Sequence, residues 1–133
     1  MATVATRKTR VGDLIKMEAG LEHGYERESR TLTVSATAEI GEVYAADGTI
    51  VVIADIAGLS GNDICILVDD AVYTDGLGAG TRAYAVLAGG AGASGAAIVV
   101  REQLKFGDGL SSGNIDSVEA VLNEKGIKVA NQQ

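Results

Sequence analysis

The chain has 133 residues, a formal net charge of −7, one cysteine, and neither proline nor tryptophan. This length suits one domain and not two, and a single cysteine excludes an intramolecular disulfide. The acidic balance argues against nucleic acid as a partner. No apolar run approaches the roughly 18 residues of a membrane span. We therefore expect a protein made in a reducing cytoplasm, with no nucleic-acid and no membrane partner.

Few aromatic side chains are available to fill a core. Phenylalanine and histidine each occur once, while glycine occurs 18 times. Val, Ile, Leu and Ala must therefore fill the interior, and such a core lacks the large burial that aromatic rings supply. A small domain with a lean core often gains stability by association. This composition is a first indication of an assembly subunit.

Residues 1–29 show no hydrophobic period. Their apolar residues are isolated among charges, Gly and Thr, and such a stretch buries too little surface to offset the entropy of ordering. We expect an extended N-terminal arm without regular structure, which becomes ordered on a partner. The pattern changes at residue 30. The chain is therefore predicted to consist of an arm at 1–29 and a β-rich domain at 30–133.

Short strands are predicted through most of the second region. Leu32, Val34 and Ala36 alternate with polar residues, which is the period of a half-buried strand, and Asp47-Gly48 suits a turn. Further strands are predicted where branched and small apolar residues gather between glycines. These runs are residues 49–54, 64–68, 82–87 and 96–101, with shorter strands near 40–43 and 127–129. The pattern predicts a mainly β, compact body.

One short helix is predicted near the C-terminus, because apolar residues recur there at the spacing of one helical face. Its apolar face consists of Ile115, Val118, Val121 and Leu122. Asp116 with Glu119 resembles a capping box, and Asn114 is a competing N-cap. Gly126 suits the left-handed residue that ends many helices.

Residue types needed for catalysis or metal binding are scarce. His23 lies in the arm beside Gly24, without the neighbours that orient a general base or a ligand, so we interpret it as an exposed side chain. Cys65 lies between Ile64 and Ile66, where a buried, unreactive thiol is expected. A Ser-His-Asp triad would have to use His23. We therefore expect no enzymatic activity, no cofactor and no metal.

Three weaker motifs are also explained without chemistry. Asp69, Asp70 and Asp75 lack the spacing of a calcium loop, and a solvated strand end explains them better. Residues 78–83 match the pattern G-x-G-x-x-A, but a dinucleotide site needs a helix there and the segment is too short for one. Lys16 faintly resembles the lysine of biotinyl and lipoyl carrier domains, but it lies in the arm with no strand before it.

The order of the patterns along the chain is more specific than any single motif. An arm is followed, in order, by Tyr25-Glu26-Arg27-Glu28-Ser29-Arg30-Thr31-Leu32-Thr33-Val34-Ser35, Ile40-Gly41-Glu42-Val43, Ala83-Tyr84-Ala85-Val86-Leu87, a Gly-rich spacer, Ala96-Ala97-Ile98-Val99-Val100, the helix, and Gly126-Ile127-Lys128-Val129. Over residues 25–129 this order resembles the bacteriophage head decoration protein D family, the lambda-like capsid decoration or cement proteins.

The resemblance implies a β-clip-like fold and a structural role on the outside of a bacteriophage head. Its implied partners are the major capsid protein and two further copies of the chain, which form a homotrimer at local threefold axes of the capsid. The arm suits pairing with an exposed strand edge, and trimerisation makes three weak arms act together. The expected capsid-binding residues are Val4, Arg7, Lys8, Arg10, Val11, Leu14, Ile15 and Leu21. The implied location is the virion surface, after synthesis in the bacterial host cytoplasm.

Other functions remain open on the sequence. A tail or baseplate module of a bacteriophage has the same Gly-rich β texture. A biotinyl or lipoyl carrier domain would carry its cofactor on Lys16. A small enzyme comes last, because a set of catalytic or metal-binding residues is missing.

Overall fold

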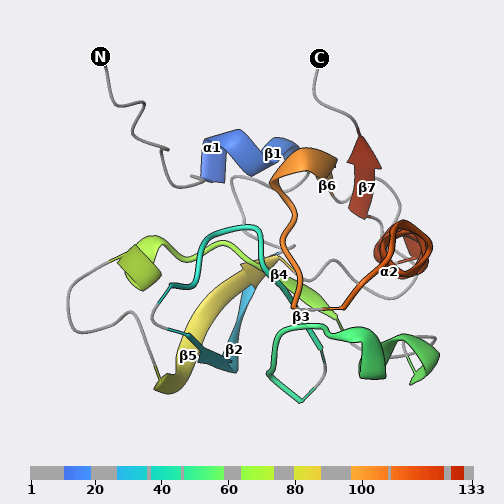
Figure 1. Cartoon of the computed structure of the whole chain (residues 1–133). Coiled ribbons are helices and arrows are strands. Elements are labelled where there is room, and N and C mark those ends of the chain that lie inside the picture. Colours follow the sequence, from blue (N-terminus) through green and yellow to red (C-terminus); the bar gives the residue numbers. More distant parts are fainter. Residues whose placement is uncertain are drawn as a thin grey trace, which may run out of the picture.

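The computed structural model describes residues 11–18, 27–35, 37–45, 47–58, 64–73, 80–87, 97–107, 109–124 and 127–130. Within them the fold is mainly β, as predicted, with a curled antiparallel sheet and one C-terminal helix (Figure 1). The elements in chain order are α1 (Val11–Leu14), β1 (Ile15–Glu18), β2 (Arg27–Val34), β3 (Val43–Tyr44), η1 (Ile53–Gly58), β4 (Cys65–Leu67), η2 (Asp70–Tyr73), β5 (Gly80–Leu87), β6 (Ala97–Val100), η3 (Arg101–Gln103), α2 (Ser112–Glu124) and β7 (Ile127–Ala130).

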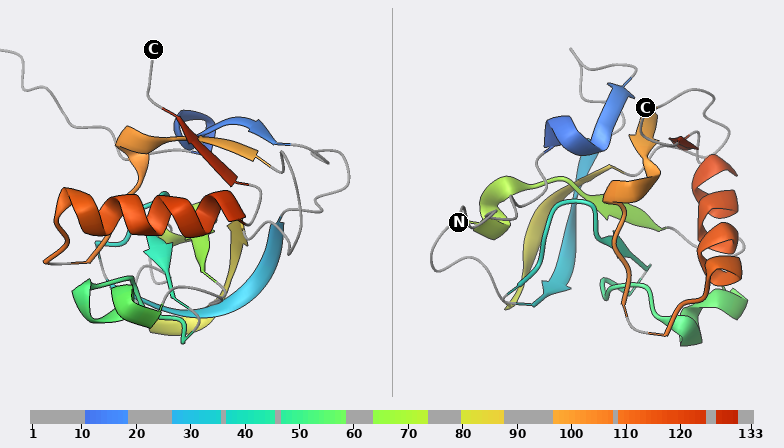
Figure 2. Two further views of the ribbon diagram at one scale, coloured as in Figure 1. Left: turned by 90° about the vertical axis from the view of Figure 1, so that its right-hand side faces the viewer. Right: turned by 45° about the horizontal axis from the view of Figure 1, so that its top comes forward.

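Two sheets form the body. The larger has the order β2-β5-β4-β3, and all of its pairings are antiparallel. The smaller has the order β1-β6-β7, with β1 antiparallel and β7 parallel to β6. Helix α2 lies between β6 and β7 in the sequence, because parallel neighbours need a crossover connection. Figure 2 shows the curled sheet on one side, the three-stranded sheet on the other, and α2 along their flank.

The longest pairing joins β2 to β5, from Arg27 opposite Leu87 to Val34 opposite Gly80. Along β2, Leu32 and Val34 are buried while Thr31 and Thr33 are exposed. This alternation follows from the two-residue period of a strand with one face in the core. The strands predicted around residues 32 and 82–87 are therefore confirmed.

Two clusters of buried side chains make up the core, and both are aliphatic with few aromatic rings. One lies where the small sheet and α2 meet the segments 40–45 and 64–68. It contains Leu14, Ile40, Val43, Ala45, Val51, Ile64, Ile66, Val68, Leu87, Val99, Leu104, Val118, Val121, Leu122 and Ile127. The other lies within the curl of the larger sheet, and it contains Leu32, Val34, Ala38, Tyr44, Cys65, Leu67, Val72, Tyr84 and Val86.

The turn predicted at Asp47-Gly48 is confirmed, but the strand predicted at residues 49–54 is wrong. Gly48 has a φ of +87°, and the Asp47 carboxylate accepts a hydrogen bond from the Thr49 hydroxyl (2.7 Å). After a single bridge at Ile50 the chain turns into η1. The reason is Asp55, whose carboxylate accepts the Val52 backbone N–H (2.9 Å) and so closes a turn in place of a strand pairing.

Helix α2 confirms the predicted apolar face but corrects its cap. Val118 and Leu122 are fully buried. The helix begins at Ser112, and the Ser111 hydroxyl accepts the Asn114 backbone N–H (3.2 Å) while the Asn114 side chain accepts the Ser111 backbone N–H (3.0 Å). This is a capping box with Ser111 as the N-cap. Neither Asn114 nor Asp116 is the cap, and Gly126 lies outside the described residues.

The expectation that residues 1–29 lack regular structure is wrong for α1, β1 and the start of β2. Leu14 is fully buried in the first core cluster, and Ile15 packs against that cluster. Ile15 is also paired with Val99 of β6. Ile15 and Met17 look isolated in the sequence because they pair with Val99 and Ile98, which are more than 80 residues away. Residues 11–18, which lie before the predicted boundary, are therefore part of the body.

Candidate functional site

The segment around Glu42 lies at the centre of the fold and joins several parts of the chain. The Leu67 backbone N–H donates to the Glu42 carbonyl (2.9 Å), and the Lys105 N–H donates to the Gly41 carbonyl (2.9 Å). Gly41 has a φ of +104°, and a Cβ at this position would collide with the Gln103 carbonyl oxygen. Glycine is needed because of both the conformation and the close approach. This packing fixes the position of the Glu42 side chain.

Glu42 is an acidic side chain inside the protein, with 9% of its surface exposed. It lies on the same side of the strand as Tyr44, because side chains two residues apart share a face. The Tyr44 hydroxyl donates to Glu42 Oε1 at 2.7 Å. Burial raises the pKa of the Glu42 carboxyl, although hydrogen bonds from Tyr44 and from the Glu39 backbone N–H oppose the shift. Burial and the neighbouring Glu42 likewise raise the pKa of Tyr44.

Lys105 is half-buried near the same segment. Its ammonium donates to the carbonyl oxygens of Gln103 (3.0 Å) and Ile40 (3.2 Å). Burial lowers the pKa of Lys105, and the charges of the surrounding carboxylates, Glu39, Glu42 and Asp13, oppose this shift. The Lys105 ammonium is thus held on backbone carbonyl oxygens within an acidic environment.

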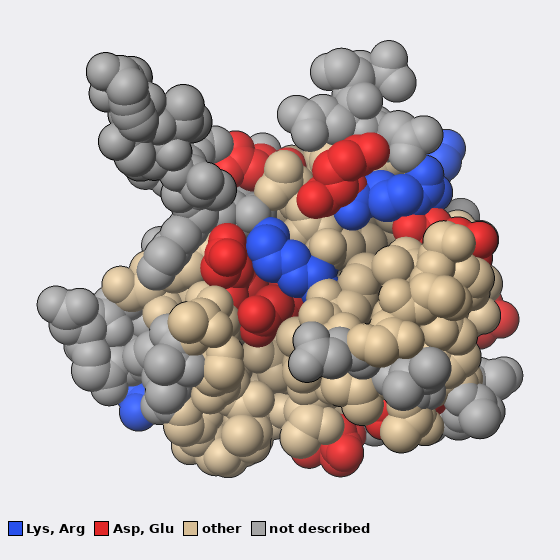
Figure 3. All heavy atoms as spheres, in the orientation of Figure 1, with Lys and Arg blue, Asp and Glu red and all other residues tan. Residues whose placement is uncertain are grey.

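Charges of both signs are mixed on the face of the molecule shown in Figure 3. In Figure 3 the Lys and Arg side chains lie beside Asp and Glu side chains. One defined pair joins η3 to α2, where Arg101 donates to both carboxylate oxygens of Glu119 (2.7 and 3.0 Å).

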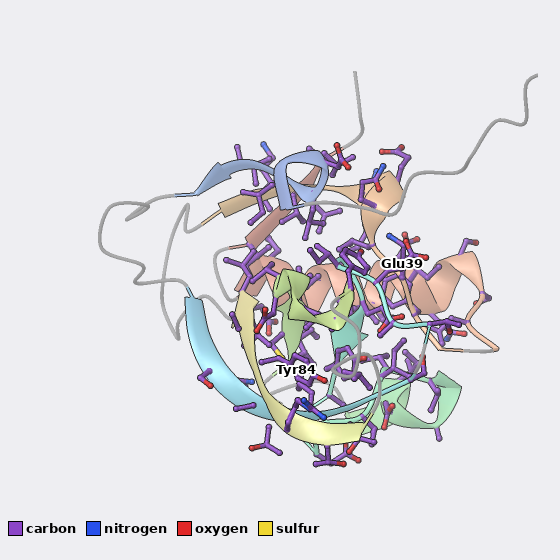
Figure 4. All side chains as sticks on the ribbon, turned by 90° about the vertical axis from the view of Figure 1, so that its left-hand side faces the viewer. Glu39 and Tyr84 are labelled. Atoms are coloured by element: carbon purple, nitrogen blue, oxygen red, sulfur yellow. The ribbon has the colours of Figure 1, made fainter. Side chains whose placement is uncertain are left out.

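A pocket of about 270 Å³ opens beside the Glu42–Tyr44 pair, and we refer to it as the Glu42 pocket. It lies between the C-terminal half of β2 and the turn that follows β3. Its lining consists of Thr33, Val34, Ser35, Glu42, Tyr44, Thr49 and Ile50. Figure 4 shows Tyr84 within the curl of β2 and β5, and Glu39 on the side nearer the three-stranded sheet. Taken together, the lining residues of the Glu42 pocket form a largely apolar surface with one buried acidic residue, Glu42.

The predicted arm residues fall into three groups. Val4, Arg7, Lys8, Arg10 and Leu21 lie outside the described residues. Val11 is the first residue of α1, and Ile15 is half-buried in β1. Leu14 is fully buried in the core, so in this structure it belongs to the body, and its contact with a capsid stays a prediction. The structure places Val11, Leu14 and Ile15 in one continuous segment of the body, and the other five lie outside the residues it describes.

Several other sequence interpretations can be compared with the structure. Cys65 is buried, as predicted. Within the G-x-G-x-x-A pattern at residues 78–83, residues 80–83 belong to strand β5 and not to a helix. Asp69 is not merely a solvated strand end, because its carboxylate accepts the Ala85 backbone N–H (3.0 Å) and ties the end of β4 to β5. Lys16 lies in β1 and not in an irregular arm. His23 and Asp75 lie outside the described residues.

The Glu42 pocket was missed by sequence reasoning. Its signal is an acidic residue within the apolar run that includes Ile40 and Val43, placed two residues before Tyr44. Two-residue spacing puts Glu42 and Tyr44 on one face. The lining from β2 and from Thr49 has no such signal, because the sheet curl and the turn bring those residues together.

Comparison with protein-family models, with curated proteins and with solved structures finds no match for this chain. In the part of the chain that the structure describes, no group of three or more His, Cys, Asp or Glu side chains is arranged to hold a metal ion. Over the same residues, no helix is both long enough and apolar enough to cross a membrane.

Proposed function

We propose that this protein is a capsid decoration protein, which binds the outside of a bacteriophage head as homotrimers at local threefold axes and stabilises the lattice of the major capsid protein. The observation that carries the proposal is the order of sequence patterns over residues 25–129, which resembles the head decoration protein D family. The activity is structural, and the partners are the major capsid protein and further copies of the chain.

The fold supports this proposal in general terms. A mainly β body with a helix before its last strand is consistent with the architecture that the resemblance implies. The face of the β2–β5 pair that points away from the core carries small uncharged side chains, among them Thr31, Thr33, Thr81 and Ala83, all exposed. A surface of small side chains lets the backbone of another protein approach closely, as it must when a strand or loop packs against a sheet.

The position of α1 shortens the segment that we propose binds the capsid, which the sequence placed at residues 1–29. Residues 11–18 belong to the body, so we assign the proposed arm to residues 2–10, which contain Arg7, Lys8 and Arg10. Because β1 pairs with β6, tension on the arm would pass directly into the small sheet.

The test is a binding assay with heads that lack their decoration protein. A variant without residues 2–10 should keep a folded body and lose binding, measured by co-sedimentation and by occupancy in electron micrographs. The matched control removes residues 131–133 and should decorate normally. Light scattering should give the mass of a trimer for all three proteins. Wild-type occupancy by the shortened variant would refute the arm, whereas binding of the full chain to tails and not to heads would refute the decoration function.

A further inference from the structure

The Glu42 pocket has the composition of a site for an amphipathic cation. Its lining includes Val34, Ile50 and Tyr44, and Glu42 is its one acidic residue. Lysine and arginine side chains have the complementary form, since an apolar stem carries a charged end. We propose that the pocket binds the ammonium or guanidinium end of a lysine or arginine side chain presented by a partner protein.

The Glu42 carboxylate is oriented for this role. The Tyr44 hydroxyl donates to Oε1 at 2.7 Å, which fixes the rotamer of the carboxylate. A buried carboxylate is stabilised strongly by a cation that also donates hydrogen bonds. The nearby Lys105 ammonium acts on Glu42 through its charge, and it donates hydrogen bonds to the carbonyl oxygens of Ile40 and Gln103. Glu42 is among the residues that line the pocket, so a cation that enters from another molecule comes close to this acidic residue.

The size and the rim of the pocket fit the same ligand. A volume of about 270 Å³ is several times the roughly 30 Å³ that one water occupies in the liquid, so it admits the end of a side chain. The rim carries the hydroxyls of Thr33 and Thr49, which are engaged with Thr81 (2.9 Å) and Asp47 (2.7 Å). Their remaining lone pairs can accept hydrogen bonds from an incoming N–H. Asp47 adds negative charge beside the entrance.

Only the source of the basic side chain rests on the proposed function. If the protein decorates heads, the partner is the major capsid protein, and the pocket adds a specific contact to the one made by the arm. A charged side chain held in a desolvated pocket is the kind of contact that contributes most to an interface. The cation chemistry of the pocket stands independently of that assignment.

The first experiment tests the chemistry of the pocket alone. The full-length, isotope-labelled protein is titrated with n-butylammonium chloride, with n-butanol as the uncharged analogue and sodium chloride to match ionic strength. We expect saturable shifts of the backbone amides of residues 33–35, 42–44 and 49–50, with a dissociation constant of about a millimolar. Glu42→Gln should weaken binding about tenfold or more, while Glu124→Gln, exposed on α2, should not change it. Equal binding of butanol, or unchanged binding by Glu42→Gln, would overturn the proposal.

A second pair of variants keeps the test decisive if Glu42→Gln does not fold. Thr49→Arg places a guanidinium at the exposed rim, where it should occupy the pocket and compete with butylammonium. Asn123→Arg adds the same charge at an exposed position of α2, outside the pocket lining, and should bind like the wild type. Equal binding by these two variants would refute the site.

The same variants separate the pocket from the proposed function. In the head-binding assay, Thr49→Arg should lower occupancy and Asn123→Arg should not. If butylammonium binds but Thr49→Arg decorates heads like the wild type, the capsid protein is not the source of the cation. If the wild type does not bind heads at all, the decoration function fails, while the butylammonium result still decides the chemistry of the pocket.

Discussion

Replacing Leu14 by alanine should destabilise the protein strongly, although the sequence places Leu14 in a charged, apparently irregular stretch. Leu14 has 0% of its surface exposed and belongs to the larger core cluster, together with Val99 and Leu122. The substitution removes three carbon atoms, which is about 2.4 kcal/mol of lost transfer free energy at roughly 0.8 kcal/mol for each. The cavity left behind raises the loss to about 3–4 kcal/mol. For a domain of this size, the melting temperature should fall by about 10 °C.

Urea unfolding followed by far-ultraviolet circular dichroism measures this loss, because the chain has no tryptophan to report by fluorescence. Val118→Ala, at a fully buried position of α2, serves as the positive control. Asn123→Ala, at an exposed position of the same helix, should change the free energy of unfolding by less than about 0.5 kcal/mol. If Leu14→Ala behaves like Asn123→Ala while Val118→Ala destabilises, α1 does not pack in the core and our account of residues 11–18 is wrong.

Three further predictions follow from the central segment and the core. Burial raises the pKa of the Glu42 carboxyl above 4.5, so the folded protein binds this proton more tightly than the unfolded chain does. The protonated carboxyl therefore contributes to stability below pH 4.5, and this contribution is lost as the pH rises through the raised pKa. Glu42→Gln should flatten the fall in urea midpoint between about pH 4 and neutral pH, and an unchanged profile would contradict the burial. Gly41→Ala should lower the melting temperature far more than Gly80→Ala does. Both glycines have a positive φ, but only at Gly41 would the added Cβ collide with a carbonyl oxygen. Equal falls in melting temperature would mean that the backbone strain of a positive φ alone matters. Cys65 should react with a thiol reagent only in denaturant, because it is fully buried, and rapid reaction of the native protein would place it at the surface.

Local patterns predicted the elements whose stability is decided locally or by one apolar face. The alternation in β2 and the apolar run in β4 gave strands, and the face that includes Val118 and Leu122 gave α2. Asp47-Gly48 gave a turn because its backbone conformation and side-chain hydrogen bond are properties of neighbouring residues. These features need no knowledge of distant parts of the chain.

The features that were missed depend on non-local contacts or on competing local hydrogen bonds. β1 is a strand because Ile15 pairs with Val99 of β6, and nothing in the sequence near residue 15 indicates that pairing. Residues 49–54 have the composition of a strand, but Asp55 captures a backbone N–H and turns the chain. The Glu42 pocket depends on the curl of β2 against the turn that contains Thr49. A sequence pattern indicates burial, but not which surfaces meet.

The small sheet takes its outer strands from opposite ends of the described chain, with residues 15–18 on one side of β6 and residues 127–130 on the other. While β7 is still inside the ribosome, the edge of β6 that pairs with β7 is therefore unpaired in the nascent chain. Pairings between such distant residues form slowly, and an open edge can pair with a neighbouring chain. Co-translational crowding should thus be most hazardous in the interval between synthesis of β6 and emergence of β7, when a truncated polypeptide is most prone to exchange strands with its neighbours.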